Sequence, residues 1–103
     1  MQKVSYAEEA YRSMCNLLYE LSQKLKTEQL EARSYKRVRK FLNACYELKT
    51  SHHDAVNLNR EREWFDKNES QLFRSQQVLM SIVDQMEYNT KRPLRVSLNI
   101  YED

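Results

Sequence analysis

The chain has no glycine among its 103 residues and a single proline, Pro93. Glycine supplies the left-handed positions of tight β-turns and lets the backbone approach nucleotide phosphates closely. Its absence argues against a β-barrel, a dinucleotide-binding unit and a P-loop. The length suits one small helical domain over residues 1–103, and abundant Leu, Glu, Gln, Lys, Arg, Met and Ala favour helix. We therefore expect an all-α protein, a bundle of three long helices with four as the alternative.

The spacing of apolar residues predicts where the first two helices lie. Ser5 and Glu8 have the spacing of a capping box, and apolar residues then recur in steps of three and four, which forms a coiled-coil-like seam. This pattern predicts a helix over residues 6–26. Thr27 is followed by acidic residues, which is typical of a helix start, and predicts a second helix over residues 28–49. No glycine or proline enforces the break, so one continuous helix to Leu48 is the alternative.

A polar stretch at residues 49–54 predicts a loop, and a third helix is expected over residues 54–89. In this helix apolar residues recur without a break at intervals of seven: Leu58, Phe65, Leu72, Leu79 and Met86. Seven residues make two helical turns, so these side chains fall along one line. A charged run at residues 66–70 could divide the segment and give a fourth helix. The seven-residue phase continues across that run, which favours one helix.

The two halves of this line differ in their neighbours. From Leu72 to Met86 it is flanked by apolar residues and is expected to lie in the core. From Leu58 to Phe65 it is flanked by charged residues and accompanied by Trp64, the only tryptophan. Tryptophan contributes much of the binding energy when a partner buries it. We expect this half to bind a protein partner, although for Trp64 alone burial in the core is the favoured alternative.

The pattern changes over residues 93–101, where Leu94, Val96, Leu98 and Ile100 alternate with other residues. A period of two predicts an extended, half-buried strand. Because no other segment offers a second strand, three arrangements would satisfy its backbone: pairing with its own copy in a dimer, addition to a partner's sheet, or packing against its own bundle. Pairing with a copy or a partner is favoured.

Basic residues gather on the second predicted helix. Arg33, Lys36, Arg37 and Lys40 share one face, and Arg39 lies nearby. A second cluster follows near the end of the chain, formed by Lys91, Arg92 and Arg95. A phosphate backbone would suit such surfaces. The net charge of the chain is only +2, however, and acidic residues of the third helix can complement these charges. A structural role is therefore favoured over nucleic-acid binding, and contact with an acidic protein partner is the third alternative.

No cluster of residues indicates catalysis or metal binding. Nucleophilic catalysis needs a base and an oxyanion site, and no motif for either is present. His52 and His53 are adjacent, whereas helical metal ligands stand one turn apart, so we expect two exposed histidines beside Asp54 as a helix cap. Cys15 and Cys45 lack metal-ligand spacing and would lie too far apart for a disulfide in a helical hairpin. We expect free thiols, no catalytic residue, no metal and no cofactor.

The sequence thus predicts a cytoplasmic, non-enzymatic protein that binds another protein. It has no apolar run of about 20 residues that could span a membrane and no signal-peptide core, and no small-molecule substrate is expected. A third helix longer than the other two would leave apolar surface uncovered, so a homo-oligomer is expected. Small adaptor, inhibitor and assembly proteins fit this description, including those of phages and mobile elements, but no motif selects a family. The expected partner-binding residues are Leu58, Trp64, Phe65, Leu94, Val96, Leu98 and Ile100. The alternative, nucleic-acid binding, would use Arg33, Lys36, Arg37, Arg39 and Lys40.

Overall fold

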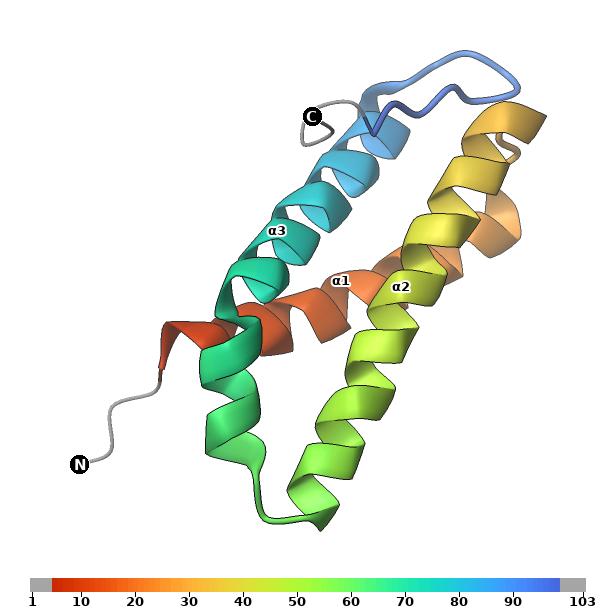
Figure 1. Ribbon diagram of the computed structural model, residues 1–103. Helices are drawn as coiled ribbons and strands as arrows, with labels where there is room; N and C mark the ends of the chain where they lie inside the picture. Colours follow the sequence, from red (N-terminus) through yellow and green to blue (C-terminus); the bar gives the residue numbers. More distant parts are fainter. Residues whose placement is uncertain (1–4, 99–103) are drawn as a thin grey trace.

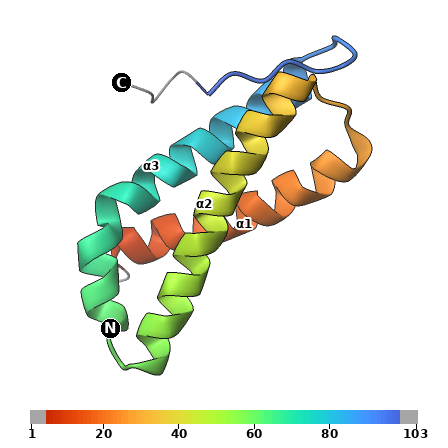
Figure 2. The same ribbon diagram turned by 45° about the vertical axis from the view of Figure 1, so that its right-hand side comes forward.

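The computed structural model describes residues 5–98, which form three helices: α1 (Tyr6–Thr27), α2 (Ala32–Asn57) and α3 (Glu61–Tyr88). Residues 5–98 contain no sheet, so the predicted all-α class is confirmed, with three helices rather than four. α2 and α3 run in opposite directions and are joined by a short turn, while α1 crosses behind both (Figure 1). The view turned by 45° again places α1 behind α2 (Figure 2). α1 is therefore one layer, and α2 with α3 is the other.

α1 follows the apolar spacing closely and ends one residue beyond the predicted range 6–26. The Glu8 amide donates to Ser5 Oγ (3.1 Å), as the capping box predicts. Thr27 does not cap the next helix as expected, because its hydroxyl donates back to the Lys24 carbonyl at the end of α1 (3.2 Å). The seam packs mainly against α3. Its buried residues are Ala7, Ala10, Met14, Leu18 and Leu21.

The break between α1 and α2 is fixed from far away in the sequence. The Glu31 N–H donates to the Leu94 carbonyl and the Leu94 N–H donates to the Gln29 carbonyl, both at 2.7 Å. These bonds pair the linker with the C-terminal part of the chain as one isolated parallel bridge between Leu30 and Leu94. The linker is therefore extended, and the second helix begins at Ala32 instead of the predicted residue 28.

The predicted loop at 49–54 is wrong, because α2 continues through it to Asn57. Two of its polar side chains, those of Thr50 and Ser51, form hydrogen bonds compatible with a helix. Thr50 Oγ1 donates to the carbonyl one turn earlier (3.1 Å), and Ser51 Oγ accepts from the indole N–H of Trp64 on α3 (2.8 Å). A polar stretch therefore remains helical because its hydrogen bonds are satisfied by the helix itself and by its neighbour.

Because α2 continues through residues 49–54, the expected roles of Asp54 and one of the two histidines are also wrong. Asp54 lies inside α2 and is not a cap; its backbone carbonyl accepts from the Leu58 N–H (3.1 Å). His53 is exposed, as expected. His52 is not fully exposed: its ring is half-buried, and its Nε2 lies 2.8 Å from Glu61 Oε2.

The turn between α2 and α3 uses an asparagine where many proteins use glycine. Asn59 has a left-handed backbone with φ of 58°. The Arg60 N–H donates to the Ala55 carbonyl (2.8 Å), and the Asn59 N–H donates to the Val56 carbonyl (3.0 Å). This pair of bonds is a Schellman motif, in which asparagine tolerates the left-handed position. α3 therefore begins at Glu61, later than the predicted residue 54, and continues unbroken across residues 66–70.

The seven-residue line is a core feature only within α3. Leu58, its first member, lies in the turn and is 68% exposed, because α2 ends there and α3 has not begun. Phe65 is buried, and so are the three members that follow it: Leu72, Leu79 and Met86. The shorter α3 also removes the premise of the oligomer expectation, since the three helices have 22, 26 and 28 residues. Homo-oligomerisation stays a prediction without that support.

The predicted C-terminal strand is not confirmed, but its alternation matches the burial of residues 93–98. Leu94, Val96 and Leu98 are buried, whereas Arg95 and Ser97 are exposed. Only Leu94 forms a bridge, and residues 95–98 belong to no regular element. The described part of the segment therefore packs against its own bundle. Ile100 and residues 99–101 of the expected strand lie outside the described residues.

Side chains of α2 and α3 bond the backbone of Val96 and Ser97 within this 93–98 segment. Ser34 Oγ donates to the Val96 carbonyl (3.2 Å) and accepts from the Val96 N–H (2.9 Å). On the other side, the Gln85 amide accepts from the Ser97 N–H and donates to the Ser97 carbonyl, both at 2.7 Å. Two side chains thus supply the hydrogen bonds that a neighbouring strand would otherwise supply. The segment lies between the start of α2 and the end of α3.

Candidate functional site

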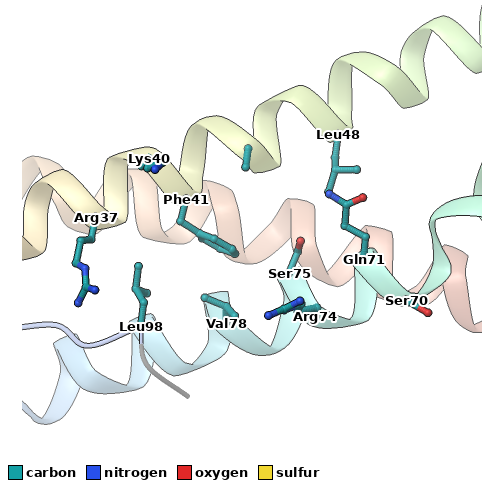
Figure 3. Close-up of a pocket in the computed structure, with 11 residues that line it drawn as sticks. Arg37, Lys40, Phe41, Leu48, Ser70, Gln71, Arg74, Ser75, Val78 and Leu98 are labelled. Carbon is teal, nitrogen blue, oxygen red and sulfur yellow. The ribbon is translucent and has the colours of Figure 1, made fainter. Parts of the chain in front are cut away.

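An open groove with a volume of about 810 Å³ lies between α2 and α3. Figure 3 shows it with α2 along one side, α3 along the other and Leu98 at one end. We call it the α2–α3 groove and define it by its lining residues: Arg37, Lys40, Phe41, Ala44, Leu48, Ser70, Gln71, Arg74, Ser75, Val78 and Leu98.

Helical spacing places these residues along the two walls. On α2, Phe41, Ala44 and Leu48 follow each other at steps of three and four, so they lie on one side of the helix. On α3, Arg74 and Val78 are one turn apart and face them. In Figure 3 the Phe41 ring points across the groove towards α3, and Val78 and Leu98 point towards it. The floor is therefore apolar.

The predicted basic stripe is exposed, and the structure divides it. Arg37 and Lys40 line the α2–α3 groove, whereas Lys36 and Arg39 line neither this groove nor the smaller cavity beside it. Arg33 lines a smaller cavity of about 280 Å³ at the start of α2. The other residues lining that cavity are Glu31, Ser34, Arg37, Arg95, Val96 and Ser97.

The second basic cluster joins the first at this smaller cavity. Arg95, separated by 62 residues from Arg33 in sequence, lines the same cavity because Val96 is hydrogen-bonded to Ser34. Arg92 turns elsewhere and pairs with Glu28, and Lys91 is exposed. The sequence predicted two separate basic clusters. Arg95 lies beside the basic stripe of α2 because the 93–98 segment packs against the start of that helix.

Most residues predicted to bind a partner are buried inside the protein. Leu58 is the exposed exception, and Ile100 lies outside the described residues. The buried ones are Trp64, Phe65, Leu94, Val96 and Leu98. These side chains are buried against the rest of the same chain. Direct contact with a partner would therefore require the bundle to open. Leu98 alone among them also lines the α2–α3 groove.

Trp64 and Phe65 belong to an aromatic cluster that joins all three helices. Tyr11 of α1, His52 of α2, and Trp64 and Phe65 of α3 have ring centroids 4.3 to 5.9 Å apart. Burial raises the pKa of the Tyr11 hydroxyl, with a smaller contribution from the neighbouring Cys15. Rings at these distances stabilise each other beyond the area they bury. The favoured alternative for Trp64, burial in the core, is thus what the structure shows.

The two cysteines are free, as predicted. Cys45 is fully buried, and burial raises its pKa to about 12, so the thiol stays protonated at neutral pH. Cys15 is half-buried. A buried, protonated thiol is a poor nucleophile, so Cys45 is both buried in the core and chemically unreactive.

Within residues 5–98, no three His, Cys, Asp or Glu side chains are grouped so that they could hold a metal ion. Across the same residues, no helix has both the length and the apolar content needed to cross a membrane. Sequence reasoning missed Gln71, Arg74 and Val78 as groove residues. Arg74 carried a signal, because it is the one cation between residues 72 and 88, in the amphipathic second half of α3.

No protein-family model matches this chain, and no curated protein or solved structure is significantly similar to it. Function is therefore inferred from the residues and their geometry.

Proposed function

We propose that the protein is a non-enzymatic interaction module that binds a helical segment of a partner protein in the α2–α3 groove. The observation that supports this most directly is the apolar floor of an open groove between two helices. Adaptors, inhibitors and assembly components act in this way, because they work by binding a partner and catalyse no reaction.

The arrangement of the helices explains why the groove suits a helix. α1 covers one side of the α2–α3 pair, and the groove lies between α2 and α3 with its own lining, to which α1 contributes no residue. A helix laid between two antiparallel neighbours buries its apolar side against both, as in four-helix bundles. Recognition of an amphipathic helix in an apolar groove is a recurring mode of protein binding. The groove therefore offers the position of a missing fourth helix.

Site-specific photo-crosslinking in cells of the native host tests this function. Ala44 is exposed and lines the groove, so a photo-reactive residue there should capture a partner. The same residue placed at Glu20, exposed on α1, is the matched control and should not capture it. A bulky Ala44→Trp substitution should abolish co-purification of the captured protein. Equal capture at both positions, or co-purification unaffected by Ala44→Trp, would refute binding in the groove.

Nucleic-acid binding is the second candidate, and one observation favours it. Arg33, Arg37 and Arg95 converge on the smaller cavity, which contains a single acidic residue, Glu31. Contacts with phosphates release counterions, so affinity for duplex DNA or RNA should fall steeply as salt is raised. Replacing Arg33 and Arg95 by Gln should weaken binding and flatten the salt dependence, while Lys49→Gln on the same helix should not. Absence of binding at low salt would exclude this candidate.

A further inference from the structure

The hydrogen bonds of the 93–98 segment fix the direction in which it crosses the bundle. Leu94 bridges to Leu30, just before α2, and Val96 bonds Ser34, four residues further along the chain. Two extended residues advance roughly 6.6 Å and four helical residues advance about 6 Å, so the segment and α2 keep in step. The segment therefore runs parallel to α2 and towards the α2–α3 groove.

The contacts with α3 give the same direction. The side-chain amide of Asn89 donates to the Arg95 carbonyl (2.6 Å), and Gln85, four residues earlier on the chain, bonds both backbone groups of Ser97. Each pair of segment residues thus covers one turn of α3 in reverse. The segment is an extended chain held between two antiparallel helices, with one register on both sides.

Leu98 brings this chain to the groove. It is buried, and it lines the α2–α3 groove together with Phe41 and Val78. Figure 3 shows it at one end of the groove, pointing into it. The register places the second residue after Leu98 one turn further along α2, between Phe41 and Ala44. That residue is Ile100, whereas Asn99 falls on the opposite side of the extended chain.

An isoleucine at this place suits the groove in chemistry and in availability. The floor beside it is apolar, with Phe41 and Leu48 on α2 and Val78 on α3. Because Ile100 is tethered two residues from Leu98, its effective concentration at the groove is on the order of millimolar. A free ligand at micromolar concentration must compete with it. The occupant nearest to the groove is therefore part of the chain itself.

We infer that Ile100 docks in the α2–α3 groove as an intramolecular occupant, which a partner helix has to displace. The docking stands on the register of the 93–98 segment, whereas the competition rests on the proposed function. An occupant present nine-tenths of the time lowers the apparent affinity for a partner about tenfold. Release of Ile100 would open the groove, so this contact is autoinhibitory.

Intramolecular photo-crosslinking of the purified full chain tests the docking. A benzophenone-bearing residue at position 100 should form crosslinks within one chain to groove peptides that contain Phe41 or Val78, as read by mass spectrometry. Ala44→Trp, which fills the groove, should abolish them. The same residue placed at Tyr88, which is 81% exposed near the end of α3, is the matched control and should form none. Crosslinks only to other surfaces, only between two chains, or unchanged by Ala44→Trp would overturn the docking.

Peptide binding to the full chain tests the competition. The probe is a labelled amphipathic peptide of about 14 residues with a leucine stripe and Gln elsewhere, followed by fluorescence anisotropy. Ile100→Glu should strengthen its binding about tenfold, because the charged side chain leaves the apolar floor. Asn99→Glu adds the same charge one residue away, on the opposite side, and should leave the affinity unchanged. No gain in Ile100→Glu, or an equal gain in both variants, would overturn the competition.

The two experiments separate this inference from the function on which its second half rests. Absence of crosslinks from position 100 to the groove, with a partner still captured at Ala44, would overturn the docking and leave groove binding standing. Crosslinks to the groove, with no peptide bound by Ile100→Glu and with equal capture at Ala44 and Glu20, would overturn the proposed function. Ile100 would then be a permanent part of the core.

Discussion

The α2–α3 pair is covered on one side by α1 and leaves an open groove on another. The covered side is lined by fully buried apolar residues, among them Met14, Leu18 and Leu79. The groove has an apolar floor too, but half-buried Phe41 and exposed Ala44 and Arg74 border it. The same helices thus make one buried interface and one open groove, which the proposed partner helix would fill. This difference points to binding, since side chains that already fill a core are not available to a partner.

The largest effect is expected on the covered side. Phe65→Ala should lower the free energy of unfolding by about 3–5 kcal/mol, because it empties a buried ring site shared with Tyr11 and Trp64. Leu58→Ala, the preceding member of the seven-residue line, should change it by no more than about 0.5 kcal/mol. Urea denaturation of both variants measures the difference. Equal losses would mean that Leu58 is buried in solution and that the turn is assigned wrongly.

A smaller loss is expected where the 93–98 segment closes one end of the open groove. Ser34→Ala removes a hydroxyl that bonds both the N–H and the carbonyl of Val96, and should cost about 1–3 kcal/mol. In this variant the Val96 amide hydrogen should also exchange faster. Ser70 is exposed on α3, so Ser70→Ala should change neither the free energy of unfolding nor the exchange rate of Val96. Unchanged protection of Val96 would show that the segment is held by other contacts.

Alkaline pH should weaken the covered side through Cys45. Burial raises its pKa from an ordinary value of 9.0 to about 12 in the folded chain, so the folded state holds the proton more tightly than the unfolded state. Its contribution to stability is therefore fully present below about pH 9 and declines as the pH rises towards 12. Between pH 8 and 10.5 the loss from this group is on the order of 1–2 kcal/mol.

A Cys45→Ala variant isolates this contribution, because alanine cannot titrate. Between pH 8 and 10.5, the free energy of unfolding of this variant should fall less than that of the original protein. Urea denaturation of both proteins measures the difference. Thiol labelling gives an independent measurement: half-buried Cys15 should react before fully buried Cys45. Equal alkaline loss in both proteins would assign the effect to another group, such as Tyr11, whose pKa burial also raises.

The smallest effect on folding is expected in the groove. Ala44→Trp places a large side chain at an exposed position, so the free energy of unfolding should stay within about 0.5 kcal/mol of the original. The same variant is expected to abolish partner binding. A thermal unfolding curve beside the crosslinking result therefore separates blocked binding from lost structure. A strongly destabilised variant would show that Ala44 is packed in solution and that the groove is closed.

Part of the candidate site was visible in the sequence. Arg37 and Lys40 belonged to the predicted basic stripe, and Phe41 and Leu48 are seven residues apart, which places them on one face of α2. The opposite wall was not predicted, because nothing in local spacing says which residues of α3 face α2. The expected partner surface at Trp64 and Phe65 was misplaced for a similar reason. Charged neighbours suggested exposure, but Tyr11 and His52 bury both rings from other helices.

The sequence alone determined that the chain is helical, that α1 follows Ser5, and that Leu72, Leu79 and Met86 are core. These features depend on composition, on capping and on periodicity, which act over a few residues. Tertiary structure alone decided the extension of α2 through residues 49–54, the linker held by Leu94, and the meeting of Arg95 with Arg33. Each depends on a partner distant in sequence, such as Trp64 for Ser51 and Val96 for Ser34. A hydrogen bond or a packed ring can overrule local preference, because its contribution of about 0.5–1.5 kcal/mol exceeds the few tenths of a kcal/mol by which such preferences differ.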